Sequence, residues 1–157
     1  MIPSRPERAP CKERLILWKP EKRRKKMMKM IDDCPARAHA MVGGLEVEVR
    51  EHPWLKHLCG YVLVPRRWKV YGRSCEQLDR MGLHPHGGVT FSEKECRGMW
   101  RIGFDCAHPC DVVPGLLGGP CYSVTEDMHL WTVDEVMAEC LALAAQIVGI
   151  GRRSDCA

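Results

Sequence analysis

The sequence predicts a small α+β domain in which an antiparallel or mixed sheet of about four strands is covered by a C-terminal helix. Three observations support this fold class: four short segments with the residue pattern of strands, one capped amphipathic helix after them, and a length of 157 residues. The apolar fraction of 45% and the charged fraction of 28% are ordinary for a globular protein. We therefore expect a single domain over residues 42–150.

The four segments differ in how they indicate a strand. They are residues 45–50, 59–65, 88–92 and 99–104. In the first, Leu45, Val47 and Val49 alternate with charged residues, as in a half-buried strand. The second is an apolar run that ends at a proline. The last two are separated only by residues 93–98, so we expect them to pair as a hairpin.

The clearest helix of the sequence follows residue 131. Thr132 and Glu135 form a capping box, with a hydroxyl at the N-cap and a carboxylate three residues later. Apolar residues then recur at helical spacing: Val133, Val136, Met137, Cys140, Ala144 and Ile147. Gly149 or Gly151 can end the helix. A shorter helix is expected over residues 74–81, in the connection between the second and third strands.

A basic arm precedes the predicted domain. Residues 1–30 contain eleven Lys or Arg and three Glu, whereas the rest of the chain has 13 basic and 17 acidic residues, so the net charge of +4 originates in the arm. We expect residues 1–41 to be partly helical or disordered, with the helix over 21–33, and residues 151–157 to form a tail. Residues 19–30 could bind the backbone of a nucleic acid. The lack of interleaved aromatic residues favours the alternative, a solvated arm.

The ten cysteines and the first residues of the chain bear on its location. The opening segment lacks the apolar run of a signal peptide, and no apolar run approaches the length of a membrane span. We therefore expect a cytoplasmic protein with no membrane partner, and thiols that are reduced and mostly buried. The chain contains no Cys-x-x-Cys pair, which argues against a zinc ribbon or a thioredoxin-type centre.

Two segments concentrate the residues that could carry chemistry, namely residues 84–92 and 103–111. If the third and fourth strands pair as a hairpin, the start of one lies beside the end of the other, which brings His86 close to Asp105 and His108. Two histidines and one or two carboxylates are a suitable ligand set for zinc, iron or manganese. The sequence therefore predicts a divalent-metal site formed by a specific set of residues: His86, Asp105, His108 and Asp111.

Each of these residues has more than one possible role. His86, Asp105 and His108 are the predicted catalytic residues; His86 could ligate a metal or act as a general base. Asp105 could be a ligand, an orienting partner for a histidine, or only a turn cap. Gly87, Gly88 and Thr90 are predicted to contact a ligand: the glycines by letting the backbone approach it, the threonine through its hydroxyl. The alternative for the glycines is a tight turn before a strand.

The segment after the fourth strand offers further alternatives. His108 and Asp111 lie three residues apart and face the same way if residues 105–111 form a helical turn. Cys106, His108 and Cys110 could instead form a thiolate zinc site, although their spacing matches no standard zinc knuckle. A cysteine nucleophile activated by a histidine is also conceivable, but no local signature supports it.

These motifs resemble those of an uncharacterised group of small proteins encoded by bacteriophages, prophages and related mobile elements. The similarity covers residues 57–148 and is carried by four segments: Gly60–Pro65, His86–Ser92, Trp100–Asp111 and Val136–Cys140. This chain has Cys110 where the group has glycine, and Arg66, Arg67 and Trp68 replace a histidine-proline approach to a Tyr-Gly pair. The resemblance implies an accessory role in the cytoplasm of a host cell, such as interference with a defence like CRISPR.

Two function classes follow from the sequence, with a third of lesser weight. The first is a metal-assisted hydrolase of a phosphate-bearing or nucleotide-like substrate, in which bound metal lowers the pKa of water. The second is a non-enzymatic anti-defence protein, similar in role to an anti-CRISPR inhibitor, which blocks a host defence protein or nucleoprotein or sequesters a small nucleotide. The third is nucleic-acid binding by the arm alone.

Overall fold

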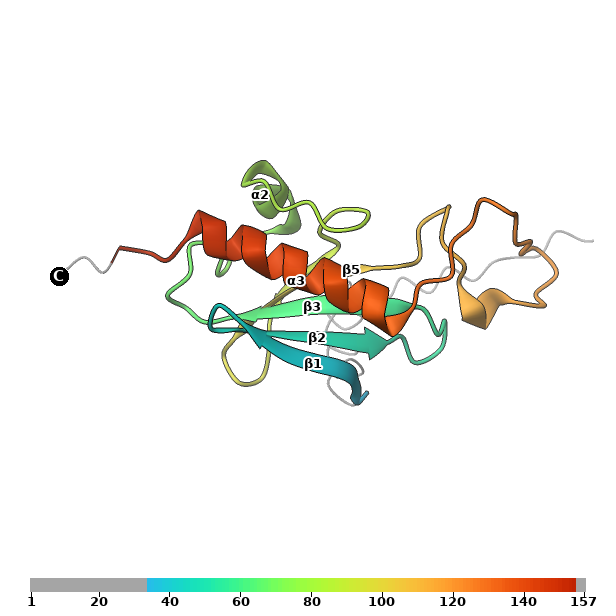
Figure 1. The fold of residues 1–157 in the computed structure, drawn as a ribbon, viewed down its shortest axis with the longest axis horizontal. Coiled ribbons are helices and arrows are strands. Elements are labelled where there is room, and N and C mark those ends of the chain that lie inside the picture. Colours follow the sequence, from blue (N-terminus) through green and yellow to red (C-terminus); the bar gives the residue numbers. More distant parts are fainter. Residues whose placement is uncertain (1–33, 155–157) are drawn as a thin grey trace, which may run out of the picture.

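A five-stranded antiparallel sheet with one long helix across one face forms the centre of the computed structural model (Figure 1), which describes residues 34–154. The expected arm helix over 21–33 and the segment 19–30 lie outside the described residues. The elements, in chain order, are β1 (Ala36–Val42), β2 (Leu45–Glu51), β3 (Leu58–Val64), α2 (Cys75–Arg80), β4 (Phe91–Lys94), β5 (Trp100–Asp105), the short 3₁₀ helix η1 (Pro114–Leu116) and α3 (Val133–Ile150). The predicted α+β class with a C-terminal helix on the sheet is confirmed.

The strand order β1-β2-β3-β5-β4 places the predicted hairpin at one edge of the sheet. β4 pairs antiparallel with β5, from Phe91 opposite Gly103 to Lys94 opposite Trp100. β5 also pairs with β3, where Cys59 lies opposite Asp105. The end of β5 and the start of β3 therefore meet at one end of the sheet, and the loops that leave this end carry the candidate site.

Strand β1 is the fifth strand, and it lies before residue 42, where we expected the domain to begin. It pairs with β2 from Val42 opposite Leu45 to Ala36 opposite Arg50, with an irregularity between Ala36 and Ala38. Its inward positions are small, and alanine has little intrinsic preference for strands. The pairing with β2 and packing against α3 therefore determine this strand more than its own composition does.

Helix α3 covers the face of the sheet on which the apolar residues of β2, β3 and β5 lie (Figure 1). Four residues of the predicted apolar stripe are buried together with Leu143, namely Val136, Cys140, Leu143, Ala144 and Ile147, while Val133 and Met137 are only partly buried. The capping box is present, since the Thr132 side chain accepts from the backbone N–H of Glu135 and the Glu135 side chain accepts from that of Thr132. No helix among residues 34–154 has both the length and the apolar character needed to cross a bilayer.

The opposite face of the sheet is more polar near β1 and β2. Glu48 is buried there and pairs with Arg50 at 2.8 Å and with Arg101 at 3.3 Å. Further along the same face, Cys59, Tyr61 and Leu63 of β3 form a second, smaller apolar cluster with Phe91 and Met99. The face under α3 is thus apolar, whereas the opposite face is charged near β1 and β2 and apolar along β3. Strand β3 is buried on both faces.

Gly60 sets how closely α3 approaches the sheet. A Cβ at this position would lie 2.5 Å from the Cys140 sulfur and 2.5 Å from the Phe104 ring.

We expect Gly60→Ala to lower the free energy of unfolding by about 1–3 kcal/mol through overpacking. Gly149, in the last turn of α3, has open space around its Cα. Gly149→Ala should therefore raise the free energy of unfolding by roughly 0.5–1 kcal/mol. Urea denaturation of both variants measures these changes in the free energy of unfolding. Equal changes in Gly60→Ala and Gly149→Ala would contradict the role of Gly60 in close packing.

Candidate functional site: a buried aspartate with two histidines

Asp111 is a buried carboxylate in the loop that follows β5. Its side chain is only 2% exposed. The loop closes as a turn, in which the Asp111 N–H donates to the His108 carbonyl at 2.8 Å. A parallel bridge then pairs Asp111 with His129. This turn places His108 and Asp111 on the same side, as the three-residue spacing predicts, without a helix.

Both oxygens of the Asp111 carboxylate accept hydrogen bonds from three residues. The Nε2 atom of His86 lies 2.8 Å from Oδ2 and 3.1 Å from Oδ1. His108 approaches Oδ2 with its backbone N–H at 2.9 Å and with Nδ1 at 3.1 Å. The indole Nε1–H of Trp131 donates to Oδ1 at 2.8 Å. A buried carboxylate needs such partners, because an unpaired buried charge is strongly unfavourable.

These contacts decide the ionisation of Asp111. Burial by itself raises the pKa of the carboxyl group, but the hydrogen bonds from His86, the His108 backbone and Trp131 outweigh burial. The pKa of Asp111 is therefore below its usual value, and the group is an anion at neutral pH.

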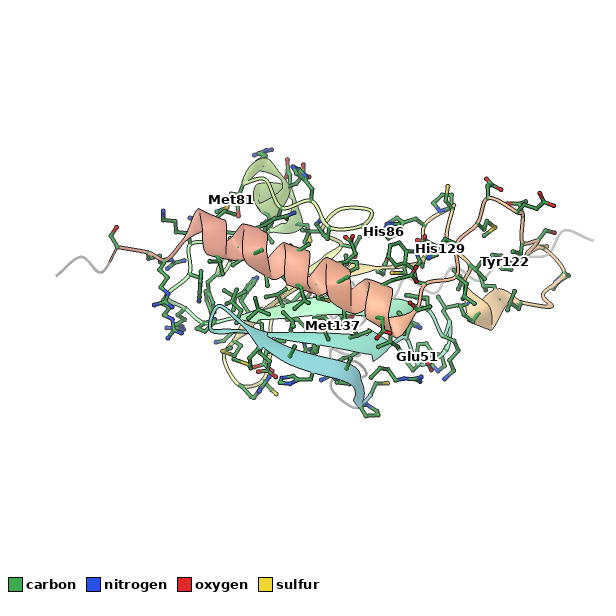
Figure 2. The ribbon with its side chains drawn as sticks, viewed as in Figure 1. Glu51, Met81, His86, Tyr122, His129 and Met137 are labelled. Carbon is green, nitrogen blue, oxygen red and sulfur yellow. The ribbon has the colours of Figure 1, made fainter. Side chains whose placement is uncertain are left out.

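His86 is held from several sides by segments far apart in the sequence. Its backbone N–H donates to the Glu139 carboxylate of α3 at 3.0 Å. Its ring packs on the Trp131 ring at a centroid distance of 4.4 Å and edge-on to the His108 ring at 5.1 Å. Figure 2 shows His86 and His129 toward the end of the molecule where α3 begins. The ring of His86 thus has a defined position before any ligand binds.

Gly87 allows His108 to lie against the backbone of the preceding turn. The turn is closed by the Gly88 N–H, which donates to the Pro85 carbonyl at 2.8 Å. Both glycines have positive φ, +66° at Gly87 and +86° at Gly88. A Cβ on Gly87 would lie only 2.1 Å from ring atoms of His108, whereas one on Gly88 would meet open space.

His86, His108 and Asp111 form a group that can hold a metal ion, and we call it the His–Asp group. One ligand atom from each residue lies within 4.8 Å of the other two. The imidazole side chains remain 25% and 29% exposed, so the group is accessible from outside although its carboxylate is buried. Asp105 stands beside it, with Oδ1 3.7 Å from the Nε2 atom of His108.

The structure brings most of the predicted site residues to one end of the sheet but gives them different positions. Three of the four predicted ligands converge; Asp105 contacts His108 from the far side of the ring instead of joining the group. Thr90 is exposed, and its N–H donates to the Gly103 carbonyl. His84 does not join the others, because its side chain is 65% exposed and pairs with Asp79.

The thiolate alternatives receive little support from the geometry. Cys106 is buried while Cys110 is exposed, and neither belongs to the His–Asp group. Burial raises the pKa of the Cys106 thiol well above its ordinary value. A thiol of this kind is a poor nucleophile near neutral pH, because the thiolate is the reactive form.

Sequence reasoning missed two groups of residues at this end of the sheet. Trp131 and Glu139 contact the site from the start of α3 and from its second turn, and only the packing of that helix brings them there. His52 and His57, in the loop before β3, stack on each other at a centroid distance of 4.8 Å. Their signal in the sequence was only their residue type.

His57 is a buried histidine in an unusual setting. It is 6% exposed, and its Nδ1 atom has no hydrogen-bond partner among the described residues. Its pKa is lowered, first by burial and then by the neighbouring His52. Asp105 and Asp111 act in the opposite direction and His108 in the same direction, but burial dominates.

Comparisons of this chain with protein-family models, with curated proteins and with solved structures find no significant match. The interpretation of the site therefore depends on its own geometry and chemistry.

Substitutions at the two adjacent glycines separate backbone strain from displacement of His108. Alanine at either position must adopt positive φ, which costs roughly 1–2 kcal/mol. Only Gly87→Ala also pushes against the His108 ring, so we expect it to lower the free energy of unfolding by more than Gly88→Ala does. We also expect it to shift the ¹⁵N resonances of the His108 ring. Urea denaturation and histidine NMR measure both effects, and indistinguishable variants would show that His108 does not depend on this contact.

The lowered pKa of His57 makes stability depend on pH. Above pH of about 6.5 the imidazole is neutral in both the folded and the unfolded chain, so it costs nothing. As the pH falls below this value, the unfolded chain binds a proton that the folded chain resists, so stability decreases, by at most about 1.4 kcal/mol per pH unit.

We therefore expect the wild-type protein to lose more stability between pH 7.5 and about pH 5.5 than His57→Phe does. Urea denaturation at the two pH values checks this. His84→Phe is the matched control, because the His84 side chain is 65% exposed and lies outside the His–Asp group. Equal losses in wild type and His57→Phe would contradict the account.

Proposed function

We propose that the His–Asp group binds one divalent metal ion and that the protein is a metal-assisted hydrolase of a phosphate-bearing, nucleotide-like substrate. The observation that carries the proposal is the convergence of two imidazole nitrogens and a buried carboxylate within 4.8 Å. They come from segments that the sheet brings to the same end.

The donor set fits a catalytic metal better than a structural one. Two histidines and one carboxylate leave coordination positions open, as in catalytic zinc sites and in iron(II) sites with a facial triad. Zinc, iron and manganese all accept these donors, and zinc suits the small ligand number best. A structural zinc site, by contrast, takes four protein ligands, usually with cysteine among them.

The neighbouring residues support this assignment, because ligands of a metal are usually held by further hydrogen bonds. Asp105 lies 3.7 Å from the far nitrogen of His108, which is beyond a hydrogen bond but close enough for an ion pair, and a carboxylate in this position could orient the ring of a ligating histidine. Trp131 donates to one carboxylate oxygen of Asp111 and covers one side of the His86 ring. Asp111 is kept anionic, which is the form that a metal requires.

The chemistry follows from these positions. A bound divalent metal would lower the pKa of a coordinated water and stabilise negative charge on a transferring oxygen. The chain itself would orient His108 through Asp105 and exclude water from one side of His86 through Trp131. The positive charge of such a site favours an anionic substrate, and a transferring phosphoryl group is one of the groups that cationic sites stabilise in the transition state.

The resemblance to small phage and prophage proteins supplies a setting for this activity. In that setting the protein would act in the cytoplasm of a host cell, and hydrolysis of a signalling nucleotide would weaken a host defence. The basic residues 19–30 would add affinity for nucleic acid in that setting.

Metal binding is tested by dialysing the full chain against zinc, iron(II) or manganese and measuring bound metal by elemental analysis. We expect close to one equivalent for the wild type, and an affinity lower by about 100-fold or more for His86→Ala and His108→Ala. Asp105→Asn should cost roughly 10–100-fold, because it removes only an orienting partner. His84→Ala is the matched control and should bind normally. Less than about a third of an equivalent, with an unchanged melting temperature on chelation, would refute the metal site.

Hydrolysis is tested separately with bis(p-nitrophenyl) phosphate and with a panel of nucleotides. We expect turnover that chelation abolishes, metal restores, and His86→Ala eliminates. Stoichiometric metal without turnover of any of these substrates would contradict the enzymatic proposal while leaving the metal site in place.

A specific observation favours a second candidate, a non-enzymatic anti-defence protein. The hydrogen bonds to Asp111 already satisfy both of its oxygens, so the same residues can hold the loops together without any metal. In that case a partner such as a host defence protein would be retained from lysate by His86→Ala and His108→Ala as well as by wild type. Loss of the partner with either variant would instead connect binding to the His–Asp group.

A further inference from the structure

A second hollow lies at the same end of the sheet as the His–Asp group, on the face away from α3. We call it the His57 cavity; its volume is about 290 Å³, and the residues that line it include His52, His57, Cys59, Tyr61, Phe91 and Asp105. Small-molecule sites typically have about 300–1,000 Å³, so this cavity suits one ring system and little more.

The walls of the cavity are mainly flat and apolar. Tyr61 and Phe91 meet edge to face at a centroid distance of 5.5 Å, and His52 and His57 stack at 4.8 Å. Rings of this kind favour a planar ligand, because flat surfaces allow the largest contact area and favourable ring–ring geometry.

His57, which lines the cavity, has one polar atom without a partner. The Nδ1 atom of His57 is buried and makes no hydrogen bond within the described part of the chain. An unsatisfied buried polar atom is unfavourable, and the binding sites of ligands are where such atoms are expected, because the ligand supplies the partner. His52, by contrast, accepts a hydrogen bond at Nδ1 from the Leu55 N–H at 3.1 Å, which fixes its tautomer.

The histidine and cysteine side chains of the cavity favour an uncharged group, although Arg50, Glu51 and Asp105 also line it. Burial lowers the pKa of both His52 and His57, so both are neutral at pH 7. Burial also raises the pKa of the Cys59 thiol to about 12, which keeps the thiol protonated. A phosphate group would not find a cationic partner among these three side chains.

The cavity and the His–Asp group are connected through Asp105. This residue contributes to the cavity wall, and its Oδ1 atom lies 3.7 Å from Nε2 of His108. Ala107, next to His108 in the chain, and Thr90, four residues after His86, also line the cavity. A molecule that extends from the cavity past Asp105 would therefore reach the His–Asp group from the side of His108.

We propose that the His57 cavity binds the base of a nucleoside phosphate, with a ring nitrogen of His57 as the hydrogen-bonding partner of the base, while the phosphate end lies near the His–Asp group. Only the placement of the phosphate end rests on the proposed function. Recognition of the base is a property of the cavity and does not require metal.

The test is isothermal titration calorimetry of the full, chelator-treated chain with adenosine, guanosine, cytidine and uridine. These nucleosides carry no phosphate, so the titration reports on the cavity and not on the metal. We expect at least one of them to bind with a Kd of about 1 mM or tighter. His57→Phe, which keeps a ring but removes both nitrogens, should weaken binding about tenfold or more. His84→Phe, the matched control, should leave it unchanged.

A second variant keeps the test valid if His57→Phe does not fold. Thr90 is an exposed lining residue, and Thr90→Trp should abolish binding by filling the space without disturbing the core. Binding that survives Thr90→Trp would overturn the inference. Binding that Thr90→Trp abolishes and that folded His57→Phe leaves unchanged would overturn the role of His57.

The outcomes distinguish this inference from the proposed function. Failure of all four nucleosides to bind, with metal-dependent phosphoesterase activity intact, would overturn the cavity as a base site and leave the hydrolase standing. Nucleoside binding that depends on His57 and Thr90, in a protein without metal or turnover, would support the cavity and contradict the hydrolase.

Discussion

The buried carboxylate of Asp111 is the interaction on which the arrangement of this end of the molecule depends. An anion that is 2% exposed is stable only if the chain surrounds it with donors, and here they come from His86, His108 and Trp131. These residues belong to the turn before β4, the loop after β5 and the approach to α3. One carboxylate therefore fixes three segments, and in doing so it sets two imidazoles beside each other.

Much of the fold could be predicted because its signals are periodic and local. The capping box and apolar stripe of α3 and the pairing of β4 with β5 follow directly from residue patterns, and the short helix α2 lies within its expected range. Strand β1 could not be predicted with the same ease. Its inward residues Ala38 and Ala40 are small and weakly disposed to form strands, so the evidence for it lies in its partner β2 rather than in its own sequence.

The candidate site also has one part that local residue patterns predict and another part that depends on long-range packing. Proximity of His86 to His108 follows from the register of one hairpin, and the sequence was sufficient for it. The position of Asp105 on the far side of His108 depends on ring orientation, which spacing alone does not determine. Trp131 and Glu139 reach His86 only because α3 crosses the sheet at a particular angle, and the His57 cavity exists because the loop before β3 folds back over the strand ends. Long-range packing of this kind has no local signature.

The central claim is that Asp111 assembles two histidines into a ligand set for one metal, and X-ray absorption spectroscopy of the zinc-loaded full chain tests it most directly. The account predicts a first shell of nitrogen and oxygen atoms at about 2.0–2.2 Å, with the outer-shell scattering of two imidazoles. His84→Ala should leave this spectrum unchanged, whereas His86→Ala should remove one imidazole. Scattering from sulfur at about 2.3 Å would contradict the account, because it would assign the metal to the cysteines of residues 106–110 instead.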